Sequence, residues 1–302
     1  MVAPADAGVF TLTPDLQYVW ADGYWILALG VVGAVVGSFL NVVIYRLPIM
    51  IGAVETPSPP QRDSSANDAR ADTRFNLIHP PSSCPWCDRR IPPWENVPIV
   101  SFLMLKGRCR GCGGRISWRY PFVEVAGAAL AAGMGLKFGL SWQLLSSLVF
   151  VWALLCIAII DLEHMLVPDA ISLPLLLAGL IVNAVGLFSG AADAVFGAVG
   201  GYLSLFSIRW GVRATTGKDA LGKGDFKLFA AIGAWLGWQG LPFVLFIACA
   251  VGGIFGIFLI LTGFVTRQQK IPFAPALAFA GVVYLSWGPE VQTAYWALIG
   301  AP

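Results

Sequence analysis

The chain has 302 residues, of which 57% are hydrophobic and only 12% are charged, and its formal net charge is +2. Its mean hydropathy of +0.74 excludes an ordinary soluble domain and indicates a polytopic membrane protein. The basic residues are spread over several connecting segments, a pattern that favours a lipid bilayer rather than nucleic acid as the partner.

Apolar runs divide the chain into membrane-spanning helices, because a helix needs about 20 apolar residues to cross a bilayer. Eight candidates occur, roughly at 24–45, 122–139, 142–160, 170–188, 192–210, 226–239, 241–265 and 273–288. The sixth is short and reaches a turn-like break between Gly237 and Pro242. The predicted fold class is an all-α polytopic membrane protein with about eight transmembrane helices.

The distribution of charge predicts how the spans are oriented. Residues 1–23 contain Asp but neither Lys nor Arg, so the first span lacks the basic segment of a cleaved signal peptide. Eight spans that start outside place residues 46–120, 161–169, 211–225 and 266–271 inside. Every Lys and Arg except Lys137 then lies in or beside these inside segments, as the positive-inside rule requires.

Composition predicts four parts along the chain. Residues 1–48 comprise the outside N-terminus and the first span, and residues 122–302 form a seven-helix membrane domain. Residues 49–80 are interpreted as a disordered insert, because their central part is rich in Pro, Ser, Ala and Asp. Residues 81–121 carry four of the six cysteines and are expected to fold as a small module on the inside.

The cysteines of this module form two CxxC pairs. Cys84 and Cys87 are separated by 21 residues from Cys109 and Cys112. Four thiolates suit tetrahedral zinc, and four protein ligands leave no open position for catalysis, so the pattern favours a structural, zinc-ribbon-like site. The alternatives are disulfides, a redox pair or free thiols, of which disulfides do not persist in a reducing compartment.

Two acidic residues lie at the ends of apolar runs, where ionisable groups are costly and usually functional. Asp161 directly follows the run from Trp142 to Ile160, and Asp225 ends the string Gly-Lys-Gly-Asp directly before another run. The two glycines of that string, Gly222 and Gly224, allow another segment to approach closely. The predicted topology places both acids on the inside face, where two carboxylates that meet could perform aspartic proteolysis.

The helix ends predict different roles for the two acids. Asp161 lies at a helix C-terminus, whereas Asp225 lies near a helix N-terminus, whose partial positive charge favours a carboxylate. We therefore expect Asp225 to activate water and Asp161 to hold a shared proton. Nearby, Glu163 is typical of a solvated loop and Asp169 fits the N-cap of the fourth span, although both acids could also attract a basic peptide leader.

Taken together, these motifs resemble the bacterial type IV prepilin peptidases, which also process type II secretion pseudopilins. The resemblance covers nearly the whole chain after residue 24. It rests on the two CxxC pairs and on the segments Gly37 to Pro48, Glu95 to Pro98, Gly107 to Cys109, Arg119 to Pro121, Val123 to Glu124, Asp161 to Asp169 and Gly222 to Leu228. One departure is Ala274, which stands in Pro-Phe-Ala-Pro where the resemblance leads us to expect Pro-Phe-Gly-Pro.

The resemblance implies an aspartic endopeptidase of the bacterial inner membrane, with a periplasmic N-terminus and Asp161 and Asp225 as its catalytic pair. Such enzymes cut a basic leader from prepilins and pseudopilins on the cytoplasmic side. Many of them also N-methylate the new terminus with S-adenosylmethionine, and Glu124 and the cysteine module lie in the part linked to methylation or substrate handling. No Gly-rich nucleotide loop follows a predicted strand, and the oligomeric state stays open.

Two other readings account for some of the same features. A secondary transporter also uses acids and broken helices, but it predicts acids near the bilayer midplane and an inverted repeat. A zinc-dependent membrane methyltransferase without proteolysis would tolerate the loss of Asp161 and Asp225. A membrane metalloprotease is disfavoured because the sequence contains no HExxH motif.

Overall fold

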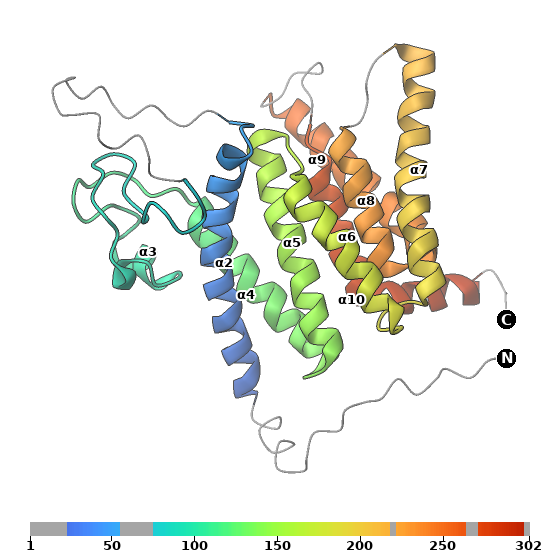
Figure 1. Ribbon diagram of the computed structural model, residues 1–302, viewed down its shortest axis with the longest axis horizontal. Coiled ribbons are helices and arrows are strands. Elements are labelled where there is room, and N and C mark those ends of the chain that lie inside the picture. The colour runs from blue at the N-terminus through green and yellow to red at the C-terminus, as the bar shows by residue number, and fades with distance from the viewer. Residues whose placement is uncertain (1–22, 55–74, 218–221, 264–270, 299–302) are drawn as a thin grey trace. The chain divides into compact units, whose positions relative to one another are not determined.

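The computed structural model describes residues 23–54, 75–217, 222–263 and 271–298 (Figure 1). Residues 1–22 and 55–74, which contain the predicted N-terminal segment and most of the predicted insert, lie outside the described residues. The described residues are mainly helical, and their β-structure consists of two isolated bridges. The chain divides into two compact units, Gly23–Ala132 and Gly133–Pro302, and the boundary falls within helix α4 (Arg119–Phe138).

The first unit contains helix α2 (Tyr24–Met50), the short helices η1 (Pro93–Glu95) and α3 (Val100–Met104), and the beginning of α4. Helices α2 and α4 approach each other through glycines, because a Cβ atom on Gly33 would lie 2.5 Å from the backbone oxygen of Gly127. Close crossings of this kind are common between membrane helices, where small residues let backbones meet. The amide of Asn41 in α2 adds a hydrogen bond of 3.1 Å to the carbonyl of Tyr120.

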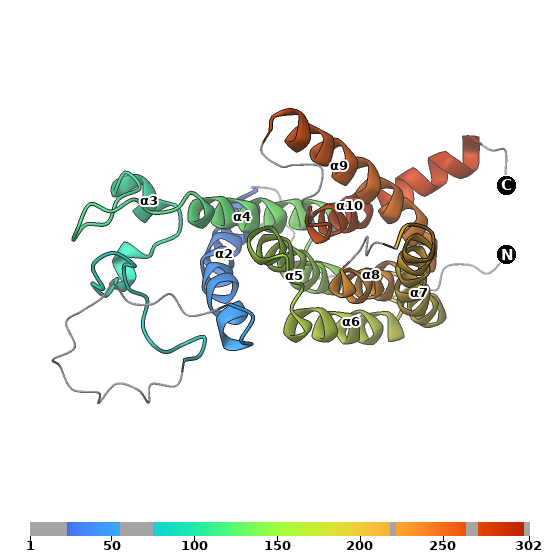
Figure 2. The same ribbon diagram turned by 90° about the horizontal axis from the view of Figure 1, so that it is seen from above.

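The second unit is a helical bundle built around α8 (Figures 1 and 2). Along the chain it contains α5 (Trp142–His164), α6 (Asp169–Ala184), α7 (Ala191–Thr216), α8 (Lys223–Leu236), η2 (Trp238–Gly240), α9 (Leu241–Leu261) and α10 (Ala274–Leu298). Helix α8 packs against α6 and α7 and also contacts α9 and α10. Nearly every residue of α8 after Gly224 is buried, so this helix forms the centre of the unit.

Helix α8 has 14 residues and is therefore about 21 Å long, which is shorter than the roughly 30 Å hydrocarbon core of a bilayer. Its C-terminal carbonyl groups must be hydrogen-bonded within the protein, because lipid offers no donors. The buried amide of Asn183 in α6 donates to the carbonyls of Ala234 and Trp235 at 2.8 and 2.9 Å. Its oxygen accepts from the backbone of Phe188 and Ser189, so one side chain closes this end of the bundle.

Helices occur at all eight positions where the sequence predicts spans. Within the described residues, five are long and apolar enough to cross a membrane, namely α2, α4, α5, α7 and the segment Trp238–Leu261 that contains α9. Helix α6 and the part of α10 from Ala274 to Gly288 are apolar but shorter. The structure thus confirms an all-α, multi-pass membrane protein, whereas eight crossings remain a prediction. The break after the sixth span is confirmed, since α8 ends at Gly237 with φ 77°.

Candidate active site and metal centre

Asp161 lies in the last turn of α5 and is 5% exposed. The helix continues to His164 and stops at Met165, whose φ of 52° is left-handed. One carboxylate oxygen of Asp161, Oδ2, accepts a hydrogen bond of 3.1 Å from the backbone N–H of Ala274, the first residue of α10. The side chain of Asp161, in the last turn of α5, is therefore directed at the beginning of another helix.

Asp225 lies in the first turn of α8 and is 6% exposed. Its Oδ2 accepts a hydrogen bond of 3.0 Å from the backbone N–H of Gly222, the N-cap residue, so the carboxylate also closes the start of its own helix. A Cβ atom on Gly224 would lie 2.6 Å from Cβ of Val167. Glycine at this position lets the loop between α5 and α6 pack directly on α8. The sequence had predicted that another segment approaches closely here.

The carboxyl groups of Asp161 and Asp225 lie near enough for their negative charges to repel each other. Both side chains are buried in the same unit and arrive from different helices. Two neighbouring carboxyl groups cannot easily both ionise, so a pair of this kind can share one proton, which is the property that an aspartic dyad requires.

The structure adds one backbone donor to the environment from which different roles were predicted for the two acids. That assignment compared a helix C-terminus at Asp161 with a helix N-terminus at Asp225. In the structure each carboxylate accepts a backbone N–H from the start of a helix, α10 for Asp161 and α8 for Asp225. Both carboxylates thus receive a donor from the positive end of a helix, while Asp161 also lies in the last turn of α5, and the division of roles between the two acids stays a prediction.

Asp169 is the first residue of α6 rather than its N-cap, which is Pro168, and its side chain makes no capping hydrogen bond. The predicted capping role is therefore wrong. Both carboxylate oxygens instead contact Nζ of Lys227 in α8 at 2.7 Å. This ion pair joins the starts of α6 and α8 near the two buried acids.

Glu163 lies in the last turn of α5, and its side chain is 32% exposed. Nε2 of the neighbouring His164 lies 3.9 Å from a Glu163 oxygen and carries charge only when protonated. The carboxylate of Glu163 is thus partly accessible to solvent. Its proposed contact with a leader stays a prediction.

Glu124 is buried in the first unit, one helical turn after the start of α4. Its Oε2 accepts a hydrogen bond of 2.7 Å from the backbone N–H of Ile99, and Ser38 of α2 also hydrogen-bonds to it. Ile99 has a φ of 64°, which is strained for a β-branched residue, and it directly precedes α3. These contacts make Glu124 the residue that ties this strained turn to the α2–α4 pair. Its part in methylation or substrate handling stays a prediction.

The four cysteines of the module meet in space. The sulfur atoms of Cys84, Cys87, Cys109 and Cys112 all lie within 4.8 Å of one another. An antiparallel bridge closes each CxxC turn, Ser83 with Arg90 and Arg108 with Arg115. The backbone N–H groups of Cys112 and Gly111 lower the pKa of the Cys109 thiol to about 6, so this sulfur is a thiolate at neutral pH. The donor set and its convergence fit a tetrahedral zinc ion.

The comparison with known proteins places this arrangement in a family. Residues 31–138 match the bacterial peptidase A24 N-terminal domain, and residues 148–257 match the type IV leader peptidase family. A Stutzerimonas stutzeri protein is 43% identical over 280 residues, which cover 90% of this chain and 93% of that protein. The chain belongs to the type IV leader peptidase family. This membership confirms the resemblance found in the sequence motifs and removes the support for a transporter.

Two further relatives align with this leader peptidase over most of both chains. An Aeromonas salmonicida (strain A449) protein is 45% identical over 275 residues, which cover 87% of this chain and 91% of that protein. A Pseudomonas aeruginosa protein is 42% identical over 276 residues, which cover 91% and 95%. These two and the Stutzerimonas protein are named prepilin leader peptidase/N-methyltransferase. No solved structure matches the chain.

One contact of the site escaped the sequence reasoning, namely the Ala274 N–H that reaches Asp161. The available signal was the string from Pro272 to Pro275, in which Ala274 departs from the motif that the resemblance leads us to expect. A proline-flanked start of a helix exposes free N–H groups, and such groups seek an acceptor. A buried carboxylate elsewhere in the chain is a natural acceptor for them.

Proposed function

We propose that this chain cleaves the leader peptide from type IV prepilins and type II secretion pseudopilins, with Asp161 and Asp225 as the catalytic pair. The observation that carries the proposal is the pair of buried carboxyl groups from α5 and α8, close enough for their charges to repel. The names of the relatives, which combine leader peptidase with N-methyltransferase, support the same substrate class.

The geometry suggests how the two acids would divide the reaction. In each carboxyl group Oδ2 is held by a backbone N–H, and within the described residues Oδ1 has no hydrogen-bond partner. The Oδ1 atoms are thus available to a water molecule and to the scissile carbonyl. The ionised acid would accept a proton from the water, while the protonated acid would donate to the carbonyl oxygen. We retain Asp225 as the base and Asp161 as the acid only as an expectation.

We propose a location in the bacterial inner membrane, with the N-terminus in the periplasm and the acids facing the cytoplasm. Support comes from the basic residues, which lie almost entirely on the segments assigned to the inside. The starts of α6 and α8 meet in the Asp169–Lys227 ion pair, so the α5–α6 and α7–α8 connections lie at one end of the bundle. A substrate with an apolar helix and a basic leader would present its cleavage point near this boundary.

We also propose that the cysteine module holds a structural zinc ion and that the chain N-methylates the cleaved product with S-adenosylmethionine. When bound, zinc would join the two CxxC turns into one fold, since so small a module has little apolar core. The cofactor would supply the methyl group. A hollow in the cysteine module does not suit S-adenosylmethionine, because the lining of the hollow is basic and this cofactor has a positively charged sulfonium. We assign no residue of this hollow to the cofactor.

The test is cleavage of a purified prepilin by the wild type and by Asp161→Asn and Asp225→Asn, which keep side-chain shape and remove the titrating groups. We expect each variant to lose at least about 100-fold in rate. Asp193→Asn is a matched control, because Asp193 lies in the first turn of α7 and its Oδ1 accepts from Nε1 of Trp238, a bond that asparagine can keep. Near-normal cleavage by either dyad variant would reject the assignment.

A second assay separates the two activities. Methyl transfer to pre-cleaved pilin is measured with the same variants, and it should persist in both Asn variants. If the wild type methylates pre-cleaved pilin but does not cleave prepilin, the result would favour a zinc-dependent methyltransferase without proteolysis. Loss of both activities together with a lowered melting temperature would indicate misfolding, and the conservative variants Asp161→Glu and Asp225→Glu would then decide whether the position of the carboxylate matters.

A further inference from the structure

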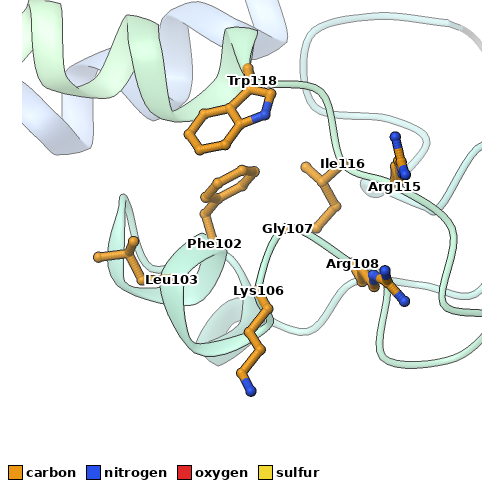
Figure 3. A pocket seen from close by; sticks show the side chains of 8 residues that line it. All are labelled: Phe102, Leu103, Lys106, Gly107, Arg108, Arg115, Ile116 and Trp118. Carbon is orange, nitrogen blue, oxygen red and sulfur yellow. The ribbon is translucent and has the colours of Figure 1, made fainter.

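The cysteine module contains a hollow of about 480 Å³ that the peptidase and zinc proposals do not use (Figure 3). Its apolar wall is formed by Phe102, Ile116 and Trp118, and the rings of Phe102 and Trp118 are in contact, with centroids 4.9 Å apart and planes tilted by 59°. Its charged lining consists of Lys106, Arg108 and Arg115. The hollow therefore combines an aromatic wall with three cations and has no acidic residue in its lining.

Among the residues that the structure describes, no acidic side chain neutralises the cations of the hollow. Within the described part of the chain, Lys106, Arg108 and Arg115 form no ion pair. Glu95 of the same module is already paired with Arg89 at 2.8 Å and with Arg110 at 3.5 Å. Arg108 and Arg115 stand directly opposite each other across an antiparallel bridge, a placement in which like charges destabilise the pair. An anion bound between them would remove that repulsion.

The surroundings of the hollow match a membrane surface. Trp118 directly precedes α4, one of the helices long and apolar enough to cross a bilayer, so the hollow lies beside the start of a candidate membrane span. Large apolar side chains on this side of the module are exposed, with Leu103 at 67%, Met104 at 79% and Trp118 at 76%. Tryptophan favours the headgroup level of a bilayer, and basic residues beside it attract anionic lipids.

We propose that this hollow binds the phosphate of an anionic phospholipid headgroup, with Arg108 and Arg115 on the phosphate and the Phe102–Trp118 wall against the start of an acyl chain. A free phosphate metabolite would account for the cations but would leave the exposed Leu103 and Met104 unexplained. The bound lipid would fix the module against the membrane surface at the start of α4. This inference does not depend on the proposed peptidase activity.

The experiment uses the full-length protein purified in a neutral detergent and titrated with phosphatidylglycerol or phosphatidylcholine. Native mass spectrometry counts the bound lipids, and inorganic phosphate is added as a competitor. We expect one phosphatidylglycerol to bind more tightly than phosphatidylcholine. Arg108→Gln and Arg115→Gln should each weaken that binding about fivefold, because one basic residue near a membrane surface contributes about that factor.

Arg90→Gln is the matched control, since Arg90 is also an exposed arginine at an antiparallel bridge of this module but does not line the hollow. It should leave phosphatidylglycerol binding within about twofold. Equal losses in Arg90→Gln and Arg108→Gln, or unchanged binding in the Arg108→Gln/Arg115→Gln double variant, would overturn the proposal. Displacement of the lipid by an equal concentration of inorganic phosphate would instead assign a free-phosphate site. If the double variant melts at a lower temperature, Lys106→Gln replaces it in the same comparison.

Discussion

The backbone N–H of Ala274 donates a hydrogen bond of 3.1 Å to Oδ2 of Asp161, across 113 positions of sequence. The first N–H groups of a helix have no partner within the helix, so α10 begins with a donor that the carboxylate of α5 satisfies. The bond also explains why alanine can stand in the Pro-Phe-Ala-Pro string. The donor belongs to the main chain, and an added methyl group does not remove it.

The first prediction removes only this donor. Ala274→Pro deletes the N–H at the first position of a helix, where proline is otherwise well tolerated. Hydrogen bonds to a charged group contribute about 1.5–3 kcal/mol, so we expect prepilin cleavage to fall by at least about tenfold. Ala274→Gly keeps the N–H and should cleave at nearly the wild-type rate. Equal cleavage by the proline and glycine variants would show that the bond does not assist the reaction.

The second prediction separates the two exposed acids near the site. Glu163→Gln should raise the KM for a substrate with a basic leader and weaken its salt dependence, while turnover at saturating substrate stays unchanged. Asp169→Asn should raise KM less, because its carboxylate is already paired with Lys227 at 2.7 Å. Steady-state kinetics at two salt concentrations check both variants. A larger KM effect from Asp169→Asn would show that the leader displaces Lys227 from this ion pair.

The third prediction concerns the closed end of α8. Asn183→Ala leaves two carbonyl and two N–H groups of the main chain without their partner. Unsatisfied buried groups cost about 1–3 kcal/mol each before any relaxation, so the melting temperature should fall by roughly 5–10 °C. Asn41→Ala is the control, since Asn41 is also buried but donates only to two carbonyls, and it should melt closer to the wild type.

The fourth prediction tests the metal centre. The purified wild type should contain about one zinc per chain, and Cys112→Ser should lose most of it, because a four-ligand site loses a thiolate. Elemental analysis measures the metal, and limited proteolysis measures whether residues 81–121 become susceptible. Cys249→Ser changes an exposed cysteine of α9 and should retain zinc. A wild-type protein that folds and resists proteolysis without any metal would contradict a structural zinc ion.

Much of the architecture could be predicted from the sequence because membrane helices are recognised from local composition. Apolar runs located the eight long helices of the described residues, and the glycine-rich break located the end of α8. Local patterns did less well at helix starts. Asp169 has the residue type of an N-cap, yet Pro168 occupies that position and the Asp169 carboxylate pairs with Lys227. The competing partner comes from another helix, and no local rule includes it.

The sequence by itself determined the family, the class of fold, the convergence expected of the four cysteines and the two acids worth testing, because each of these depends on residue type and spacing along the chain. Only the tertiary structure decided what surrounds each carboxyl group. Asp161 follows a helix C-terminus in the sequence but accepts a donor from the N-terminus of α10 in space. The electrostatic environment of a carboxyl group depends on distances in space. Residues far away in the chain can therefore be its nearest neighbours, and only the folded structure identifies them.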